Sequence, residues 1–480
     1  MSTQQLVRRL TAVDAAALLV GSMIGSGIFL APSLMAKNLS APGIYLGIWA
    51  LAGLLTLLGA FSYAELAAMM PEAGGQYVYL RRAMGRLPGF LYGWTLFLVI
   101  QSGFVAAVAI AFAKYLGVFF PSIGEGKLLF QLSVTPAGPQ GLSTAQGVAL
   151  LVIAVLTAVN GRGVQAGAFL QNLFTGLKLV GLWGLVFLIL FLGHRLGHGN
   201  VANFAPLWSS EVPKLPGAVQ AGFLAALGVA ASKALFCYDA WNTVTFAAAE
   251  VKDPQRNLPK ALMWGSLLTT VTYVGAAAGY LYLFPLSEMA QVPENRIAAE
   301  AAQKLLGSVG GQLIAAVILV STFGCINGMI LGGARVLYAM AHDGLFFQVA
   351  GRLNRNHAPG WALLLLGGWS GVLALSGKYD DLLTYTTFAS LLFNAATAGC
   401  VLLLRWKQPT LERPYKAFLY PFSTVAFIVV ALGFAVYIVQ GDPSSSLRGL
   451  LLVLLGIPAY VLLQRKLAAT QVMTETDVAG

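Results

Sequence analysis

Two short segments combine small, polar or charged residues inside long hydrophobic runs. The first is GSMIGSGIF at residues 21–29, where three glycines accompany Ser22 and Ser26. Small residues spaced by four let two helices pack closely, and this packing role is one interpretation of the segment. The other is an interrupted helix in mid-membrane, whose exposed N–H groups and positive helix end would bind a carboxylate.

The second segment is FCYDAWN at residues 236–242, which places Asp239 deep in an apolar run. An ionisable residue within a span indicates a functional position, unless it caps a helix end or pairs with a lysine. If the helix is interrupted here, the carbonyls of Phe236, Cys237 and Tyr238 become available to an ammonium group. Two interrupted helices, one in each half of a chain, are typical of transporters built from inverted repeats. The sequence itself shows no convincing internal repeat.

Lys178 lies near the centre of another apolar run, NLFTGLKLVGLWG. At a rise of 1.5 Å per residue it is roughly 18 Å from either end, too far for its side chain to reach water. It must face the protein interior, where it could exchange protons, replace a coupling cation as a fixed charge, or simply bond backbone carbonyls. Lys233 is interpreted as structural, and Glu65 and Glu250 as carboxylates that anchor helix ends or loops.

Signatures of enzymes and metal sites are missing from the sequence. The histidines form no cluster with metal-ligand spacing, and no GxSxG, P-loop, HExxH or CxxC occurs. A membrane enzyme would need converging catalytic residues at one face, and a channel would need a filter segment. The three cysteines lie in apolar segments, so no disulfide is expected. We therefore predict neither an enzyme, nor a metal site, nor a cofactor.

Composition identifies the elements that must hold these residues. Of 480 residues, 58% are hydrophobic and only 10% are charged, whereas a soluble protein carries about 25% charged residues. The surplus apolar surface must face lipid, so the predicted fold is an all-α polytopic membrane protein. The net charge of +11 reflects basic residues in short loops, which favours the positive-inside rule over nucleic-acid binding.

About twelve runs are long enough to span a bilayer. They lie near 13–37, 43–70, 87–118, 144–161, 166–193, 217–248, 260–285, 309–341, 360–377, 380–404, 418–440 and 448–464. With the N-terminus inside, lysine and arginine number 18 on the cytoplasmic side and 9 outside. This bias predicts that both termini are cytoplasmic. The longest polar stretches, near 119–143, 194–216 and 286–308, are loop-sized.

Several segments together resemble the amino acid–polyamine–organocation superfamily, and within it the L-type amino acid transporter family. GSMIGSGIF is similar to the first-helix motif of that family, and FCYDAWN to its sixth-helix motif. Three further matches follow in the family's order along the chain: PEAGGQYVYLRRAMG (71–85), STFGCINGMILGGARVLYAMAHDG (321–344) and LRWKQPTLERPYK (404–416).

The resemblance implies a leucine-transporter-type fold with two inverted five-helix repeats and two further helices. The implied parts are a cytoplasmic segment 1–12, repeats 13–193 and 217–404, two helices within 418–464, and a cytoplasmic tail 465–480. It also implies that Gly25, Ser26 and Gly27 bind the carboxylate of an amino acid. The implied contacts of its amino group are the carbonyls of Met23, Ile24, Phe236 and Cys237, with Tyr238 and Asp239 completing the site. Phe236 would close over the substrate as outer gate, and Lys178 would stand where sodium-coupled relatives hold an ion.

Two departures from the family pattern bear on this interpretation. The family usually has glycine after the residue at 239, where this sequence has Ala240. The loop 119–143 has no cysteine, whereas animal members use one there to bond a heavy-chain partner. We therefore expect a bacterial-type protein of the inner membrane that works without that subunit.

The resulting hypothesis is sodium-independent exchange of small neutral amino acids, such as alanine, serine, threonine or cysteine, by alternating access. Proton-coupled uptake through Lys178 is an alternative mechanism. Because Asp239 could attract a second ammonium group, exchange of cationic amino acids is an alternative in substrate.

Overall fold

The structure is a computed structural model that describes residues 8, 10–135, 138–162, 164–215, 218–220, 222–356, 358–376 and 379–464. Most of the predicted segment 1–12 and the whole predicted tail 465–480 therefore lie outside the described residues.

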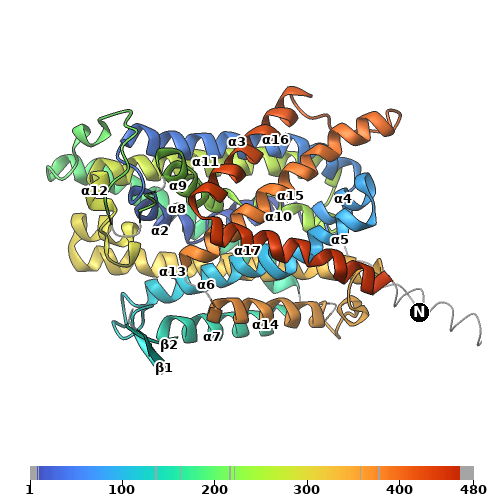
Figure 1. Ribbon diagram of the computed structural model, residues 1–480, viewed down its shortest axis with the longest axis horizontal. Helices are drawn as coiled ribbons and strands as arrows, with labels where there is room; N and C mark the ends of the chain where they lie inside the picture. The colour runs from blue at the N-terminus through green and yellow to red at the C-terminus, as the bar shows by residue number, and fades with distance from the viewer. Residues whose placement is uncertain are drawn as a thin grey trace, which may run out of the picture.

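In the part of the chain that the structure describes, twelve apolar helical units form a bundle, and most of their axes run across the view of Figure 1. Among the described residues nine are long enough to cross a membrane alone, and Thr144–Asn160, Phe223–Tyr238 and Gly360–Leu375 are shorter. This confirms the predicted all-α polytopic fold with about twelve spans. In chain order the first five spans are α1 (Ala12–Met23) with α2 (Gly27–Ala36), α3 (Pro42–Met69), α5 (Arg86–Thr95) continued by η1 (Leu96–Ile100) and α6 (Gln101–Leu116), α7 (Thr144–Asn160) and α8 (Val164–Arg195).

The second five spans begin with another helix in two pieces. They are α9 (Phe223–Tyr238) with α10 (Thr243–Phe246), α11 (Pro254–Leu283), α13 (Ile297–His342), α14 (Gly360–Ser376) and α15 (Tyr379–Lys407). The last two are α16 (Phe422–Gly441) and α17 (Pro443–Leu454), the latter within an apolar helical stretch that reaches Gln464. α13 bends at Gly307, where φ is +68°, so only its later part is the predicted span 309–341.

The polar stretches form small elements at the ends of the bundle. They are the hairpin β1 (Leu128–Thr135) and β2 (Gly138–Ser143), η2 (Val201–Phe204), α12 (Leu286–Met289), η4 (Pro293–Asn295), α4 (Gln76–Met84), η3 (Ala248–Glu250) and η5 (Gln348–Gly351). β1 and β2 pair antiparallel. All of them are loop-sized, as predicted.

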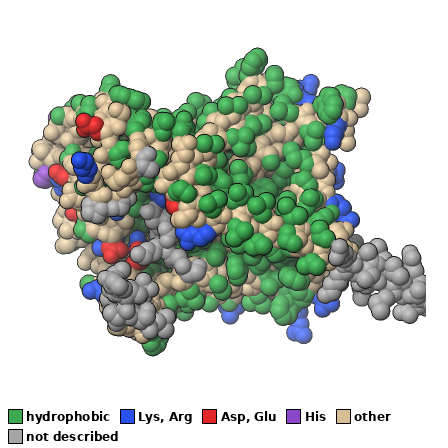
Figure 2. All heavy atoms as spheres, viewed as in Figure 1, with side chains coloured by type: hydrophobic (Ala, Val, Ile, Leu, Met, Phe, Trp, Pro, Cys, Tyr) green, Lys and Arg blue, Asp and Glu red, His purple; other side chains and the backbone are tan. Residues whose placement is uncertain are grey.

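Local sequence signals set several helix starts. Thr11 caps α1 in a capping box with Asp14, and Ser143 caps α7 in the same way with Gln146. Prolines open α3 and α11, where the missing N–H has no role within the helix. Figure 2 shows a broad hydrophobic surface over the middle of the bundle, with charged side chains gathered toward its two ends. This is the surface that a bilayer requires.

Several helix contacts recur when each of the first five spans is replaced by its equivalent among the second five. The α1–α8 contact has a counterpart in α9–α15, α8–α13 in α15–α6, and α6–α7 in α13–α14. α3 packs on α11, and α6 on α13, each pairing equivalent helices. Such matching is what two structurally equivalent five-helix units would give, although no repeat is visible in the sequence. The exact repeat boundaries, 13–193 and 217–404, stay a prediction.

Candidate functional site

The helix of the first span is interrupted at the glycine-rich segment. α1 ends at Met23 and α2 begins at Gly27. Ile24 leaves the helical region with ψ +79°, and the Gly25 amide donates to the carbonyl of Met23 at 2.8 Å. The helix interruption predicted for GSMIGSGIF is thus confirmed, and the binding of a carboxylate there stays a prediction. The first residues of α2 carry N–H groups that have no acceptor within their own helix.

The sixth span is interrupted as well, a little later than the sequence suggested. α9 continues to Tyr238, and the non-helical residues run from Asp239 to the start of α10. The Asp239 amide lies 3.2 Å from the carbonyl of Phe236 and bonds it, so that carbonyl is not free. Ala240 has φ +65°, a left-handed conformation that costs a non-glycine residue about 1–2 kcal/mol. The helix breaks here although glycine is replaced by alanine.

The two interruptions meet inside the bundle. A Cβ on Gly27 would lie only 2.4 Å from the sulfur and 3.2 Å from the Cα of Cys237, so α2 and α9 are in direct contact. The hydroxyl of Tyr273 on α11 lies 2.6 Å from the carbonyl of Met23 and 3.1 Å from that of Cys237. A phenol donates a single proton, so it serves one carbonyl at a time. Two carbonyls from different halves of the chain therefore face one point, beside the start of α2.

Lys178 sits behind the first interruption, fully buried. Its ammonium donates to the carbonyls of Gly21 at 2.7 Å, Ile24 at 2.9 Å and Ser321 at 3.3 Å. The Ser321 hydroxyl also donates to the Ile24 carbonyl at 3.1 Å. The prediction that Lys178 faces the interior is confirmed. The Ile24 carbonyl, expected to bind an amino group, is engaged by Lys178 and Ser321 in this conformation.

Phe236 and two thiols close the space around the interruptions. The Phe236 ring stacks on Phe104 of α6, with centroids 4.5 Å apart and planes 28° apart. Cys325 of α13 donates to the carbonyl of Ser22 at 3.2 Å, and its sulfur lies 2.8 Å from where a Cβ on Gly25 would be. Glycine is therefore required at 25 and 27 for close approach.

Asp239 belongs to a neighbouring polar cluster rather than to the glycine segment. Its carboxylate accepts from the Ala240 amide at 2.9 Å, and it lines two small cavities together with Ser390 and Asn394 of α15. One of these cavities extends to Phe104, the stacking partner of Phe236. The structure thus brings together Met23, Gly27 and Cys237, whereas Asp239, just after the end of α9, lines cavities with residues of α15.

Sequence reasoning did not identify Tyr273, Phe104, Ser321 or Cys325 as parts of this region. Ser321 and Cys325 belong to the segment STFGCINGM, whose small and polar residues were a usable signal. Tyr273 had none, because its position matters only once two distant carbonyls converge on it. Of the remaining ionisable residues, Lys233 is buried and donates to Thr384 at 2.9 Å, as a structural lysine would.

Comparisons with known proteins agree with this architecture. The profile of the family described as "Amino acid permease" matches residues 10–458. The human "Cystine/glutamate transporter" is 28% identical over 467 residues, covering 95% of this chain and 85% of that protein. The human "b(0,+)-type amino acid transporter 1" is 30% identical over 416 residues, covering 86% and 79%. The mouse "Asc-type amino acid transporter 1" is 29% identical over 454 residues, covering 94% and 80%.

These matches confirm the resemblance read from the motifs and exclude the enzyme alternative. The interrupted helices, the lipid-facing surface and the match over nearly the whole chain agree. The chain belongs to the amino acid permease family of the amino acid–polyamine–organocation superfamily, and it is a multi-pass membrane transporter of amino acids.

Proposed function

We propose that this transporter exchanges small neutral amino acids across the membrane, without sodium, by alternating access at the two helix interruptions. The observation that carries the proposal is the convergence of the Met23 and Cys237 carbonyls on Tyr273, beside the start of α2. Carbonyls suit an α-ammonium group, and a helix N-terminus suits an α-carboxylate. Ser26 and Gly27 would bind the carboxylate. The Tyr273 hydroxyl would give up its hydrogen bond to one of the two carbonyls, and the ammonium would then bind that carbonyl.

Sodium independence is supported by the surroundings of Lys178. Three carbonyls converge on its ammonium, in the arrangement that a bound monovalent cation would otherwise require. A covalently attached positive charge fills that place permanently, so no dissolved cation needs to bind there. A proton could still leave the lysine during the cycle, and proton-coupled uptake is the alternative mechanism.

The preference for small side chains is supported by the close packing around the interruptions. Gly25 and Gly27 face the sulfurs of Cys325 and Cys237 with no room for a methyl group, and Phe236 stacks on Phe104 above them. A bulky substrate would have to displace several of these groups, whereas alanine or serine displaces few.

A second candidate substrate class is favoured by Asp239. One of the small cavities that Asp239 lines is also lined by Phe104, the ring on which Phe236 stacks. A long side chain ending in an ammonium or guanidinium group could extend to the Asp239 carboxylate. Under this alternative the protein would exchange arginine, lysine or ornithine for neutral amino acids.

Uptake of labelled alanine into proteoliposomes tests these proposals. We expect uptake to require unlabelled alanine inside and to be the same when choline replaces sodium. Labelled arginine entering much better than alanine would overturn the neutral assignment in favour of the Asp239 alternative. Accumulation driven by a pH gradient, with no internal amino acid, would establish proton coupling instead of exchange.

Orientation and partners are also proposals. We propose an inner-membrane location with both termini cytoplasmic, from the distribution of lysine and arginine. We further propose that the protein works without a disulfide-linked heavy chain, because loop 119–143 has no cysteine. Purified protein that exchanges alanine with no other polypeptide present would support the latter.

A further inference from the structure

Residues 405–422, which connect α15 to α16, combine charged and aromatic side chains that the proposed transport site does not use. We call them the connecting segment. It contains four basic residues and a single acidic one, Glu412. Figure 1 places it at an outer corner of the bundle, at the end where α1 begins. Figure 2 shows basic and hydrophobic side chains close together on the surface at this corner.

Hydrogen bonds to a buried carboxylate hold the connecting segment against α3. Glu65 of α3, only 1% exposed, accepts from Arg405 at 2.7 Å and 2.9 Å and from the Ala417 amide at 2.7 Å. Arg413 lies 3.4 Å from the same carboxylate and donates to four backbone carbonyls within residues 404–411. The segment is therefore attached to α3 near both of its ends, and its outward-facing side chains have a defined arrangement.

Large hydrophobic side chains of the connecting segment are exposed. Trp406 is 79% exposed, Phe418 58%, Leu419 61% and Phe422 78%. A group of exposed apolar side chains rimmed by polar ones marks a site of interaction with a protein or a membrane. In membrane proteins, aromatic residues are enriched at the level of the lipid headgroups. Because this segment joins two membrane-spanning helices, we place its aromatic side chains at that level.

Positive charge accompanies these apolar side chains. Lys407 and Lys416 are both exposed. Arg405 and Arg413 share the one carboxylate of Glu65, so the charges of the two arginines are only partly balanced. Basic residues clustered directly beside a membrane-spanning helix attract anionic lipid headgroups. A soluble anion would bind the charges without covering the aromatic side chains, whereas a phospholipid does both.

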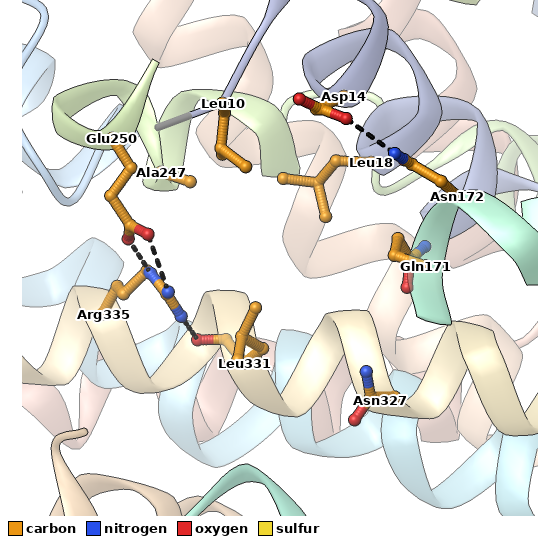
Figure 3. A pocket seen from close by; sticks show the side chains of 10 residues that line it. All are labelled: Leu10, Asp14, Leu18, Gln171, Asn172, Ala247, Glu250, Asn327, Leu331 and Arg335. Atoms are coloured by element: carbon orange, nitrogen blue, oxygen red, sulfur yellow. Dashed lines mark hydrogen bonds and ion pairs between the residues drawn. The ribbon is translucent and has the colours of Figure 1, made fainter. Parts of the chain in front are cut away.

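Another ion pair at this end of the bundle lacks this excess of charge. Glu250 and Arg335 are both buried, and Arg335 donates to the two carboxylate oxygens at 2.5 Å and 3.2 Å (Figure 3). One negative charge balances one positive charge there. The connecting segment differs because two arginines share a single carboxylate and two lysines are exposed beside them.

We propose that the connecting segment is a binding surface for anionic phospholipids of the leaflet at this end of the bundle. Lipid phosphates bind the ammonium groups of Lys407 and Lys416, and the apolar part of the lipid contacts Trp406, Phe418 and Phe422. In the orientation proposed above, this leaflet is the cytoplasmic one. The inference does not depend on which amino acid is transported.

Bound lipid should stabilise the protein, because it covers a segment that joins α15, α16 and α3. α15 also carries Ser390 and Asn394, which line the cavities beside Asp239. The lipid surface is thus linked through one helix to the region of the second interruption.

Thermal stability in lipids of different headgroup charge tests this surface. The purified protein in a neutral detergent is titrated with phosphatidylglycerol, or with phosphatidylcholine of the same acyl chains. The lipid concentration that gives half of the maximal rise in thermal midpoint is determined. The test variant combines Lys407→Gln with Lys416→Gln. The matched control combines Arg352→Gln with Arg355→Gln, which removes two exposed charges between η5 and α14.

We expect phosphatidylglycerol to raise the midpoint at a lower concentration than phosphatidylcholine does. The double lysine variant should need at least about tenfold more phosphatidylglycerol, because each lysine at a lipid surface changes the affinity roughly fivefold. Its response to phosphatidylcholine should stay the same, and the control should change by less than about twofold. Trp406→Gln should weaken the response to both lipids, because it removes an apolar contact.

Equal shifts in the two double variants, or no shift in either, would show that the connecting segment is not the lipid site and would overturn the inference. Glycerol 3-phosphate, the soluble probe of the same phosphate chemistry, should leave the midpoint unchanged. If it raises the midpoint as phosphatidylglycerol does, the segment binds a free phosphate and the assignment to a lipid is wrong.

Discussion

Single residues decide how the two interruptions are held. Lys178 joins α8 to the backbone of the first interruption and to Ser321 of α13 by donating to three carbonyls. Ala240 holds the second interruption in a left-handed conformation that favours glycine. Lys178 stabilises the first interruption by hydrogen bonds, whereas Ala240 adopts a strained backbone conformation at the second.

Lys178→Ala should reduce alanine exchange at least about tenfold, because the carbonyls of Gly21, Ile24 and Ser321 each lose the hydrogen bond from the lysine. Exchange per folded molecule is measured in proteoliposomes, after size-exclusion chromatography shows that the variant is folded. Lys233→Ala, which removes another buried lysine, should retain most of the activity. Normal turnover of Lys178→Ala would remove this residue from the mechanism.

Ala240→Gly should raise the free energy of unfolding by about 1 kcal/mol, because glycine adopts a positive φ without strain. The measurement is the thermal midpoint of the purified protein in detergent. Ala247→Gly is the matched control: Ala247 has φ −98°, so glycine there should destabilise the protein. A lower midpoint for Ala240→Gly would show that the left-handed residue is not strained.

At the scale of elements, the contact between α2 and α9 joins the two halves of the chain. It depends on Gly27, because a Cβ at this position would lie only 2.4 Å from the sulfur of Cys237. Tyr273 adds α11 to the same point. The three helices therefore meet at one point between the two interruptions.

Gly27→Ala should force α2 and α9 apart and reduce exchange about tenfold, since overpacking of this kind costs about 1–3 kcal/mol. Gly184→Ala on α8 is a suitable control, because no atom lies within 4 Å of the added methyl group. That control should leave exchange unchanged. Full activity of Gly27→Ala in the same assay would mean that the close contact is dispensable.

At the scale of the whole molecule, ion pairs join neighbouring segments at the end of the bundle where α1 begins. Glu250 pairs with Arg335, Asp343 with Arg81, and Glu65 with Arg405. Tyr77 also donates to Asp343 at 2.7 Å, and burial together with that carboxylate raises the pKa of Tyr77, so it remains a donor. These contacts hold neighbouring segments together at this end of the bundle.

Arg335→Met should favour opening at this end, because the Glu250 carboxylate is left buried without its partner, at a cost of about 3–5 kcal/mol. We expect a lower thermal midpoint and faster modification of Cys325 by N-ethylmaleimide, followed by mass spectrometry. Adding Glu250→Gln should restore part of the stability. Arg82→Met, which breaks the exposed pair with Glu72, should have little effect. Equal effects of the two arginine variants would contradict this role for the Glu250–Arg335 pair.

Much of the architecture was predictable because lipid imposes simple rules. Spans had to be long and apolar, so their number and most boundaries followed from hydropathy alone. Lys178 had to face inward because its side chain could not reach water. The glycines at 25 and 27 and the charge at Asp239 marked both interruptions, since such residues are unfavourable inside an ordinary span.

The sequence by itself determined the membrane fold, the family and the two interrupted segments, because local composition decides which residues can lie in lipid and where a helix is weak. Tertiary structure alone decided that the carbonyls of Met23 and Cys237 face Tyr273, that Ile24 is held by Lys178, and that Asp239 lies with α15. These contacts join residues up to 250 positions apart. They depend on how rigid helices pack against one another, which no local pattern specifies.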